Sequence, residues 1–420
     1  MFFSNIILTA TILFSSAAKS IHVFASSELK PPTSHSTHVL REKTNLGNAF
    51  HGGKYVPHVS RIDKRISHTV IFAIEQSNMD ELTKVLHDVS DPTSLNYGKF
   101  WSKQKVGDFT FNKRSHEATL KYLRSRKGIK IEHETLHGEY IFATAPIHVW
   151  EDVFATTFAS YAIAGENHHY QSLIRAEAYS IPIELDKHVS AVFNTVQFPP
   201  PNLLKSFVEI EQSEIPAAID GLIYGYVTPE LINKFYHVIN NTITGAGTQA
   251  VYESLNQSYS PSDLLKFQKY FNLTVHGVSE DIGGHAFNNS CVSDGGNNCL
   301  EANLDVQYLM GIAEGVKTVY YYSEDWILSW ITTVADSANP SDVYSISYTS
   351  YELGFSMSYL NSFNNEAIKL GTMGTTILSS SGDDGVAGYL VRDNSTYCGY
   401  NPQFPSSSPY VVSVGGTNVR

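Results

Sequence analysis

Apolar positions recur with the period of a helix between Cys299 and Met310. The apolar stripe consists of Ala302, Val306, Leu309 and Met310. Because neither Gly nor Pro interrupts this stretch, the pattern predicts a largely buried helix. Glu301 and Asp305 lie four residues apart, so both carboxylates share one face of that helix. Such a pair is either solvated at the surface or used as a coupled acid and base, and the spacing alone favours the solvated pair.

Strand and helix patterns alternate between residues 66 and 196. The predicted strands are Ser67–Ile74, Ile129–Ile131 and Tyr140–Ala143, and the predicted helices are Met79–Val89, His116–Arg126 and Val149–Phe154. This order favours a small α+β, ferredoxin-like sandwich. The preceding residues 26–54 are polar and rich in Ser, Thr, His and Pro, which favours a flexible lead.

A second unit is predicted after the three prolines Pro199–Pro201 and an acidic linker. Buried-strand patterns alternate with helical stretches from Leu222 onward. The predicted strands are Gln249–Tyr252, Thr318–Tyr321, Val343–Ile346 and Thr375–Leu378. This alternation predicts a parallel α/β sheet with helices on both faces.

The charge of the chain divides along the same boundary. The 420 residues carry a net charge of −12 and are 42% hydrophobic, as in a globular protein of about two or three domains. Residues 26–200 hold 20 basic and 19 acidic side chains, whereas residues 201–420 hold 8 and 22, and 14 of the 17 histidines precede residue 201. This asymmetry predicts two units with different roles. No basic cluster with interleaved aromatic residues occurs, which argues against a nucleic-acid partner.

The first 25 residues have the pattern of a secretory signal peptide. An apolar run from Ile6 to Ala18 is too short to span a bilayer and ends in small residues, and no later stretch is long and apolar enough to be a transmembrane helix. Sequons for N-glycosylation begin at Asn240, Asn256, Asn272, Asn288 and Asn394. All five follow residue 239, so the later region is predicted to be the lasting, glycosylated product.

The segment His133-Glu134-Thr135-Leu136-His137 matches the zinc motif H-E-x-x-H. That motif requires a helix that turns both imidazoles toward one metal. Here it follows a strand-like segment and runs directly into Gly138, so a hairpin is the favoured interpretation. We therefore predict no metal site at these histidines.

Two further segments contain candidate functional groups. A buried strand ends in Ser381-Gly382-Asp383-Asp384, and ligands bind at the carboxyl ends of strands in parallel α/β sheets. An Asp-Gly turn is also common for reasons of backbone geometry alone. The second segment, Phe404–Thr417, is by itself a turn, a strand and a Gly loop.

Together these segments resemble the sedolisin family of serine-carboxyl peptidases, and the resemblance covers most of the chain. The matching motifs, in family order, are Asp91–Ser102, Ile181–Pro199, Thr228–Tyr236, Glu301–Asp305, Ser381–Asp383 and Ser408–Thr417. The first two resemble the activation prodomain of the family, and the third resembles the start of the mature enzyme. The implied fold is a subtilisin-like parallel sheet, incomplete here, preceded by a ferredoxin-like prodomain.

The resemblance also implies roles for single residues. Glu301 would be the general base for a serine nucleophile, and Asp305 would orient Glu301. Asp383 would be protonated and would donate to the oxyanion, with Asp384 as the alternative residue for that role. A further segment, Ser345, Ser347 and Tyr348, would line the substrate groove. A glutamate base implies an acidic compartment.

The sequence departs from the family pattern at two places. Thr349 stands where the family has a Gly beside the substrate groove, so the cleft is expected to be narrower. The family nucleophile belongs to a Gly-Thr-Ser motif that occurs nowhere in the 420 residues, and the calcium ligands of the family also lie beyond Arg420. A partner for Cys398 is expected there too, whereas Cys291 and Cys299 could pair with each other. We therefore interpret the sequence as truncated before the nucleophile and expect the 420-residue polypeptide to be inactive.

The expected organisation is a signal peptide (1–25), an activation prodomain (26–200), a linker with the processing site (201–221) and a truncated catalytic domain (222–420). The first functional hypothesis is an acid endo- or exopeptidase precursor of the secretory pathway, extracellular or in a lysosome or vacuole, whose partners are its own prodomain and a peptide or protein substrate. The alternative is a secreted, peptide-binding pseudoprotease. Protonation of prodomain histidines near pH ~6.5 is expected to change the interaction between the units, with a sign that the sequence leaves open.

Overall fold

The computed structural model describes residues 37–44, 55–57, 62–163, 173–199, 227–239, 241, 245, 247–284, 286–287, 291, 299–323, 326–392 and 394–416. We call the described residues 37–199 the first half and 227–416 the second half. The predicted signal peptide, the predicted linker and the sequons at Asn240 and Asn288 lie outside the described residues.

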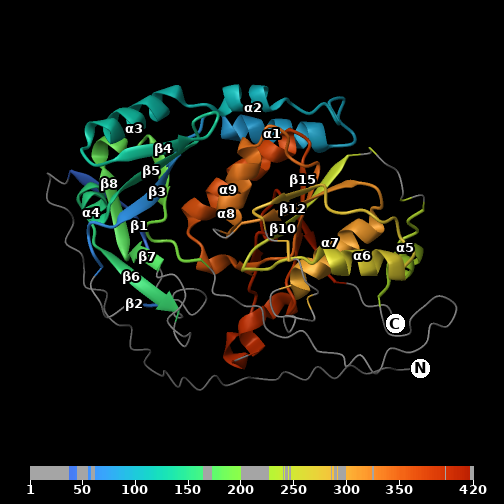
Figure 1. Ribbon diagram of the computed structural model, residues 1–420. Coiled ribbons are helices and arrows are strands. Elements are labelled where there is room, and N and C mark those ends of the chain that lie inside the picture. The colour runs from blue at the N-terminus through green and yellow to red at the C-terminus, as the bar shows by residue number, and fades with distance from the viewer. Residues whose placement is uncertain are drawn as a thin grey trace, which may run out of the picture. The chain divides into compact units, whose positions relative to one another are not determined.

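A four-stranded antiparallel sheet forms the centre of the first half, in the order β4-β5-β3-β9 (Figure 1). Its strands are β3 (Ser67–Ile74), β4 (Lys130–Glu134), β5 (Tyr140–Pro146) and β9 (Val189–Phe193). Its helices are α1 (Met79–Ser90), α2 (Lys103–Thr110), α3 (Lys113–Ser125), α4 (Ile147–Phe154) and the short 3₁₀ helix η2 (Ile183–Leu185). This βαββαβ order, with β3 between β5 and β9, is that of a ferredoxin-like sandwich.

Burial on one face of this sheet explains the predicted pattern. Val70 and Phe72, two residues apart on β3, are both fully buried and belong to the same core cluster as Trp150 and Phe154 of α4. The indole Nε1 of Trp150 donates a hydrogen bond of 2.8 Å to the carbonyl oxygen of His68. The apolar body of the tryptophan is therefore buried while its polar atom stays paired.

Two small sheets join segments that are far apart in the sequence. Strand β1 (His38–Lys43) pairs with β8 (Ala178–Pro182), and β6 (Phe158–Ile163) lies between β2 (Tyr55–Pro57) and β7 (Leu173–Ala176). The prediction of a flexible lead over residues 26–54 is therefore wrong for β1. These short strands are ordered by partners far along the chain, which a local pattern cannot reveal.

The zinc-like motif lies in a β-hairpin, as the sequence favoured. Strands β4 and β5 are antiparallel, with His133 opposite Phe142. His137 lies in the turn before Gly138, which has a positive φ of 70°. The ring of His137 covers Gly107 of α2, where an added Cβ atom would lie 2.1 Å from the ring. The two imidazoles therefore do not lie on one helix face.

A six-stranded, fully parallel sheet organises the second half in the order β11-β12-β10-β13-β15-β17. Its strands are β10 (Thr248–Glu253), β11 (Glu280–Ile282), β12 (Lys317–Tyr322), β13 (Val343–Ile346), β15 (Thr376–Ser380) and β17 (Val412–Val414). Its helices are α5 (Pro229–Phe235), α6 (Pro261–Tyr270), α7 (Leu300–Ile312), α8 (Trp326–Asp336) and α9 (Met357–Thr372). The shorter elements are β14 (Ser350–Tyr351), β16 (Gln403–Phe404), η5 (Glu352–Gly354), η6 (Gly385–Ala387), η7 (Tyr389–Arg392) and η8 (Ser395–Tyr397).

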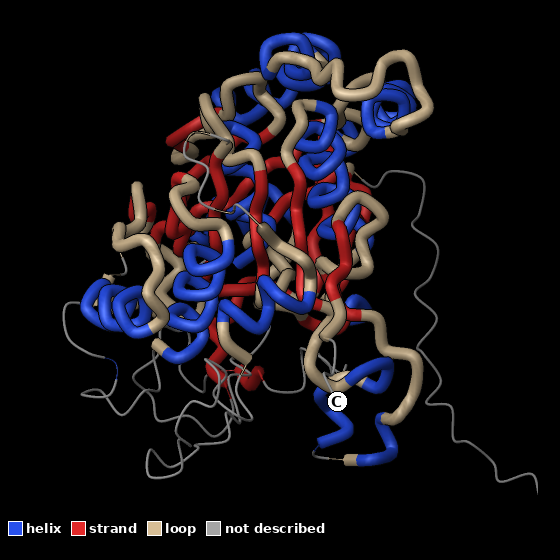
Figure 2. Tube along the Cα trace, turned by 90° about the vertical axis from the view of Figure 1, so that its right-hand side faces the viewer, coloured by secondary structure: helices blue, strands red, loops and turns tan. Residues whose placement is uncertain are grey.

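Helices cover both faces of this parallel sheet, as predicted (Figure 2). Val251 of β10 packs in a cluster with residues of α6 and α7, whereas its neighbour Tyr252 packs in a cluster with residues of α8 and α9. Side chains on both faces are thus removed from water, which is why these strands read as nearly continuous apolar runs.

Side-chain caps fix where several of these helices begin. The hydroxyls of Thr228, Ser260 and Ser356 accept hydrogen bonds from backbone N–H groups in the first turns of α5, α6 and α9. A proline occupies an early position of α5 and of α6, where a missing N–H group costs nothing.

The strand order reverses at β10. The chain first runs outward to β11 and back to β12 on one side of β10, and then adds β13, β15 and β17 on the other side. Ligands of open parallel sheets bind beyond the carboxyl ends of the strands at such a reversal. The ends of β10 and β13 are therefore the expected place for a functional site.

Within the part of the chain that the structure describes, no helix combines the length and the apolar character needed to cross a bilayer.

Candidate active site

Three acidic side chains from β10 and α7 interact at the carboxyl end of β10. Glu253 is the last residue of β10 and is fully buried. Glu301 and Asp305 belong to consecutive turns of α7, whose buried positions Ala302, Val306 and Met310 hold the helix against the sheet. The predicted helix is confirmed, and its two acids are not simply a solvated surface pair.

Hydroxyl groups of the segment after β13 hold two of these carboxyl groups. Ser347 Oγ donates a hydrogen bond of 2.6 Å to Asp305 Oδ2. Tyr348 Oη donates a hydrogen bond of 2.6 Å to Glu253 Oε2. The negative charge of Asp305 acts on Glu253, whose Oε1 atom is buried without a hydrogen-bond partner among the described residues. Burial and this neighbouring charge both favour the neutral form of Glu253.

The pKa values of all three acids are raised. Burial is the largest cause for Glu301, and the negative charges of Asp305 and Asp383 add to it, which raises the pKa of Glu301 to about 8. Burial raises the pKa of Asp305 to about 6 against the opposing hydrogen bond from Ser347. Burial and the charge of Asp305 raise the pKa of Glu253 well above its usual value. Groups coupled in this way titrate together, so the cluster holds protons at pH values where isolated carboxyl groups have lost them.

The turn after β15 carries Asp383, the residue expected at the oxyanion position. Gly382 has a φ of 88°, which permits the sharp turn. The side chain of Asp383 is 91% exposed and lies 3.9 Å from Arg392 Nη2. Asp384 is more buried and accepts a hydrogen bond of 2.6 Å from Arg392 Nε. Asp383 thus influences Glu301 through its charge, while its carboxyl group points to solvent.

The three predicted substrate-groove residues differ in their burial and in their hydrogen-bond partners. Ser345 is half-buried within β13, and Ser347 is bonded to Asp305. Tyr348 is buried, so its hydroxyl serves the acidic cluster. The Oγ1 atom of Thr349 lies 3.7 Å from where a Cβ atom on Gly382 would be, so this side chain stands beside the turn that carries Asp383.

Glu253 is the site residue that the sequence prediction missed. It follows the apolar run of β10 directly, at the carboxyl end of a parallel strand. A lone acid at such a strand end is the signal that could have identified it. Its complete burial could not be foreseen, because the covering residues Asp305 and Tyr348 come from distant segments.

A disulfide precedes the helix that carries the acids. Cys291 and Cys299 are bonded with a Cα–Cα distance of 5.8 Å, and Cys299 is the residue before α7. Cys398 is exposed and carries a free thiol. Within the described ranges, no group of three or more His, Cys, Asp or Glu side chains is placed to hold a metal ion. The calcium ligands implied by the family resemblance are expected beyond Arg420, and this expectation stays a prediction.

Comparison with known families identifies the first half. Residues 54–198 match the family model described as Pro-kumamolisin, activation domain. These residues form a pro-kumamolisin activation domain.

Curated relatives resemble the activation domain and the second half together. Tripeptidyl-peptidase 1 of Pan troglodytes is 28% identical over 383 residues, which cover 86% of this chain and 63% of that protein. Physarolisin of Physarum polycephalum is 28% identical over 369 residues, which cover 83% of this chain and 59% of that protein. The chain thus spans less than two thirds of the length of these relatives.

A solved structure of Pseudomonas sedolisin, a serine-carboxyl proteinase complexed with two molecules of pseudo-iodotyrostatin, is also similar. It matches 46% of this chain and 54% of that chain, at 20% identity and a TM-score of 0.35. This TM-score is too low to assign the fold, which rests on the strand order described above.

A buried ionic cluster joins the activation domain to helix α9. Lys369 Nζ lies 3.0 Å from Glu139 Oε1 of the activation domain and 2.6 Å from Glu366 Oε2 of its own helix. Tyr140 and Gln76 of the activation domain donate hydrogen bonds to Glu366 Oε1, of 3.1 Å and 3.2 Å. Burial opposes ionisation of Glu139, but Lys369 and the hydrogen bonds outweigh it and lower its pKa to about 2. This ion pair therefore persists in mild acid.

His68 gives the activation domain a different response to acid. Its Nε2 atom lies 2.7 Å from the carbonyl oxygen of Asn194, and its ring packs against Phe158. Burial, with the charge of Arg175 added, lowers the pKa of His68 from 6.5 to about 4. The folded domain therefore favours neutral His68, and the stability that this provides is present above pH 6.5 and is lost as the pH falls toward 4.

We expect the His68→Gln variant to reduce the acid destabilisation of the activation domain. Between pH 7 and pH 4.5, the free energy of unfolding of this variant should fall by about 1–2 kcal/mol less than that of the parent chain. Hydrogen exchange of peptides from β3 and β9 measures it, and His87→Gln, which changes an exposed histidine on α1, is the matched control. If His68→Gln retains the pH dependence of the parent, His68 is not the acid-sensitive group.

Proposed function

We propose that this chain is the precursor region of an acid serine-carboxyl peptidase of the sedolisin type, which cleaves peptides in the manner of a tripeptidyl-peptidase or an endopeptidase. The observation that carries this proposal is the coupled pair Glu301 and Asp305, buried with raised pKa values at a strand-order reversal. It occurs in a chain whose residues 54–198 match an activation domain and which is similar to tripeptidyl-peptidase 1 over 86% of its length.

In this proposal Glu301 accepts the proton of a serine nucleophile supplied by sequence outside these 420 residues. Asp305 is the positioning residue for Glu301 in this proposal, and the hydroxyl of Ser347 in turn holds Asp305 by a hydrogen bond. Because Glu301 and Asp305 titrate together, they can share one proton, and Glu301 acts as the base in the fraction of molecules that carries this proton on Asp305. Asp383, in protonated form, would turn inward from its exposed position to donate a hydrogen bond to the oxyanion.

The proposal includes passage through the secretory pathway to the cell exterior, a lysosome or a vacuole. Three sequon asparagines, Asn256, Asn272 and Asn394, are described and all are exposed, as an N-glycan requires. The disulfide between Cys291 and Cys299 also fits an oxidising compartment. The activation domain is the proposed intramolecular partner, and a peptide or protein is the proposed substrate.

A second candidate function is a secreted, peptide-binding pseudoprotease. This alternative requires that the natural protein lacks the family motif Gly-Thr-Ser, which does not occur in the 420 residues. A chain with the acidic pair but without a nucleophile could hold a peptide and could not form an acyl-enzyme.

Cleavage assays of the natural protein, purified from its source at its natural length, distinguish between these two functions. Ala-Ala-Phe-aminomethylcoumarin and a denatured protein are offered as substrates from pH 3.5 to pH 7, together with the recombinant 420-residue chain. We expect acid-dependent cleavage by the natural protein, with removal of the activation domain, and none by the 420-residue chain. A natural protein that ends within the 420 residues, binds peptides and leaves both substrates intact would overturn the peptidase proposal in favour of the pseudoprotease.

A further inference from the structure

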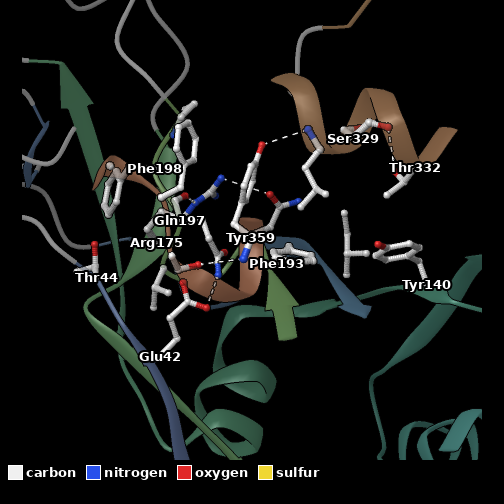
Figure 3. Close-up of a pocket in the computed structure, with 18 of the residues that line it drawn as sticks. Glu42, Thr44, Tyr140, Arg175, Phe193, Gln197, Phe198, Ser329, Thr332 and Tyr359 are labelled. Atoms are coloured by element: carbon white, nitrogen blue, oxygen red, sulfur yellow. Dashed lines mark hydrogen bonds between the residues drawn. The ribbon is translucent and has the colours of Figure 1, made fainter. Parts of the chain in front are cut away.

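A cavity of about 540 Å³ lies between the first half and helices α8 and α9 of the second half (Figure 3). Small-molecule sites in proteins have volumes of roughly 300–1,000 Å³ and often occur between domains. Among the described residues, Glu253, Glu301 and Asp305 do not line this cavity, so it is separate from the candidate active site. It is thus a space of ligand size that the proposed reaction does not use.

Aromatic side chains from both halves contribute to the wall of this cavity. Phe142 of β5 and Phe193 of β9 come from the activation domain. Tyr359 of α9 and Phe355, which precedes α9, come from the second half. The rings of Phe193 and Tyr359 meet edge to face with centroids 6.0 Å apart, and Phe355 stacks on Tyr359 with centroids 5.0 Å apart. Such faces and edges pack favourably against other aromatic rings, so the wall favours a ring compound that contacts both halves.

The buried guanidinium group in this wall is already bonded to the protein through every nitrogen. Arg175 of β7 is 8% exposed. Its Nε and Nη1 atoms donate hydrogen bonds to the carbonyl oxygens of Gln197 and, at 2.8 Å, of Ile174. Its Nη2 atom donates to Asn194 Oδ1 at 3.3 Å. Figure 3 shows Arg175 beside Gln197. Arg175 thus holds β7 to the segment after β9, and we assign it no ligand.

Other polar groups of the lining are also bonded to protein atoms. Tyr359 Oη accepts a hydrogen bond of 3.1 Å from the backbone N–H group of Leu328. Glu42 Oε2 accepts hydrogen bonds from Gln197 Nε2, at 3.1 Å, and from Ser358 Oγ of α9, at 2.9 Å. A charged ligand would lose its hydration here and would have to displace such bonds, which is costly. An uncharged ligand pays little for its transfer and gains from the burial of its apolar surface.

We propose that this cavity binds an uncharged aromatic ring compound, and that the bound molecule fastens the first half to α8 and α9. A ligand that binds the joined halves and not the separated ones stabilises the precursor by mass action. Such a ligand would slow the separation of the activation domain from the second half. Binding to the precursor requires no peptidase activity, so the site is tested independently of the proposed function.

The test compares two fluorescent probes that differ by one charged group, with the purified 420-residue chain at pH 7. N-phenyl-1-naphthylamine is uncharged, and 8-anilino-1-naphthalenesulfonate has the same ring system with an added sulfonate. We expect saturable fluorescence enhancement by the uncharged probe at one site per chain. The sulfonate should displace that probe at least tenfold more weakly than unlabelled N-phenyl-2-naphthylamine does. Equal displacement by the two competitors would overturn the assignment of an uncharged ligand.

Two cavity variants locate the bound probe. Ser329→Phe fills the cavity from α8 and should weaken binding at least tenfold. Leu353 lines the cavity and is 57% exposed, so Leu353→Trp narrows the cavity with little disturbance of the core and should weaken binding to a smaller extent. Both variants should retain the circular dichroism spectrum of the parent. Thr333→Phe, at an exposed position of α8, is the matched control and should bind as the parent does.

Hydrogen exchange tests whether the bound probe fastens the two halves. With the uncharged probe at saturation, peptides from β9 and from the start of α9 should exchange more slowly than in the free chain. Peptides from α6, which does not line the cavity, should change less. Absence of saturable binding, or binding by both cavity variants equal to that of the parent, would overturn the site. Unchanged exchange in β9 and α9 at saturation would overturn the fastening of the first half to the second.

Discussion

Replacing Glu301 by Gln should make the second half more stable at pH 8 and at the same time abolish the proposed peptidase activity of the natural protein. Burial and neighbouring negative charges raise the pKa of Glu301 to about 8. A raised pKa means that the folded state prefers the protonated group, so this stabilisation is complete below the ordinary pKa and is lost as the pH rises toward 8. A glutamine stays neutral at every pH, so the variant does not lose this stability as the pH rises.

The expected gain for Glu301→Gln at pH 8 is on the order of 2 kcal/mol, and the gain should vanish near pH 4. Urea unfolding of the 420-residue chain, monitored by hydrogen exchange of peptides from α7, measures this gain in stability. Glu280→Gln, which changes an exposed acid on β11 of the same sheet, is the control and should change stability little at either pH. In the natural protein, Glu301→Gln should lower kcat/KM at least ~1,000-fold because the base is lost.

The two readouts of Glu301→Gln test different statements. Equal pH dependence of stability in the variant and the parent would contradict the electrostatic account of the acidic cluster. Retained activity of the variant in the natural protein would contradict the catalytic role of Glu301 and leave the stability result standing. A stability gain combined with an activity loss is the trade-off typical of functional sites that hold like charges together.

The Lys369→Met variant should lose about 3–5 kcal/mol of stability, because it leaves two buried carboxyl groups without their cation. Lys369 is 4% exposed, and it contacts Glu139 of the activation domain and Glu366 of α9. Methionine retains most of the volume of the lysine chain, so the loss reports charge rather than a cavity. Thermal unfolding and urea unfolding of the 420-residue chain at pH 7 measure it.

Two further variants make the test of Lys369 specific. Lys266→Met removes a lysine that is 69% exposed and lies 3.1 Å from Asp263, and it should cost less than ~1 kcal/mol. The double variant Glu139→Gln with Lys369→Met should recover part of the loss, since one of the two orphaned acids becomes neutral. A cost below ~1 kcal/mol for Lys369→Met would show that the cluster is hydrated rather than buried.

The local pattern of apolar residues was sufficient to predict the helices and strands whose own sequences are periodic. The helix over α7 and the strands β3, β10, β12, β13 and β15 were predicted at or near their observed bounds, because each alternates or repeats its apolar positions over its full length. The strands β1 and β8 were not predicted. They are held by each other across the length of the activation domain, and their sequences are mixed in polarity.

The candidate site likewise contains residues that the sequence could predict and residues that it could not. Glu301 and Asp305 could be paired from their helical spacing, since i and i+4 residues share a face whatever the fold. Glu253 could not be added to them, because its burial depends on residues from α7 and on Tyr348, which follows β13. The exposed position of Asp383 also lay beyond prediction, because it depends on the path of the chain between β15 and η7, whose last residue Arg392 lies 3.9 Å from Asp383 Oδ2.

Helix α9 packs both against the activation domain and within the second half. Phe363 and Leu370 of α9 lie in one core cluster with Tyr140 and Phe193 of the activation domain, and Ile368 packs with Leu82 of α1. In the proposed processing, removal of the activation domain would expose the surface of α9 that packs against it. A mature form would then be preserved by the height of its unfolding barrier, and its working life would be set by a rate rather than by an equilibrium.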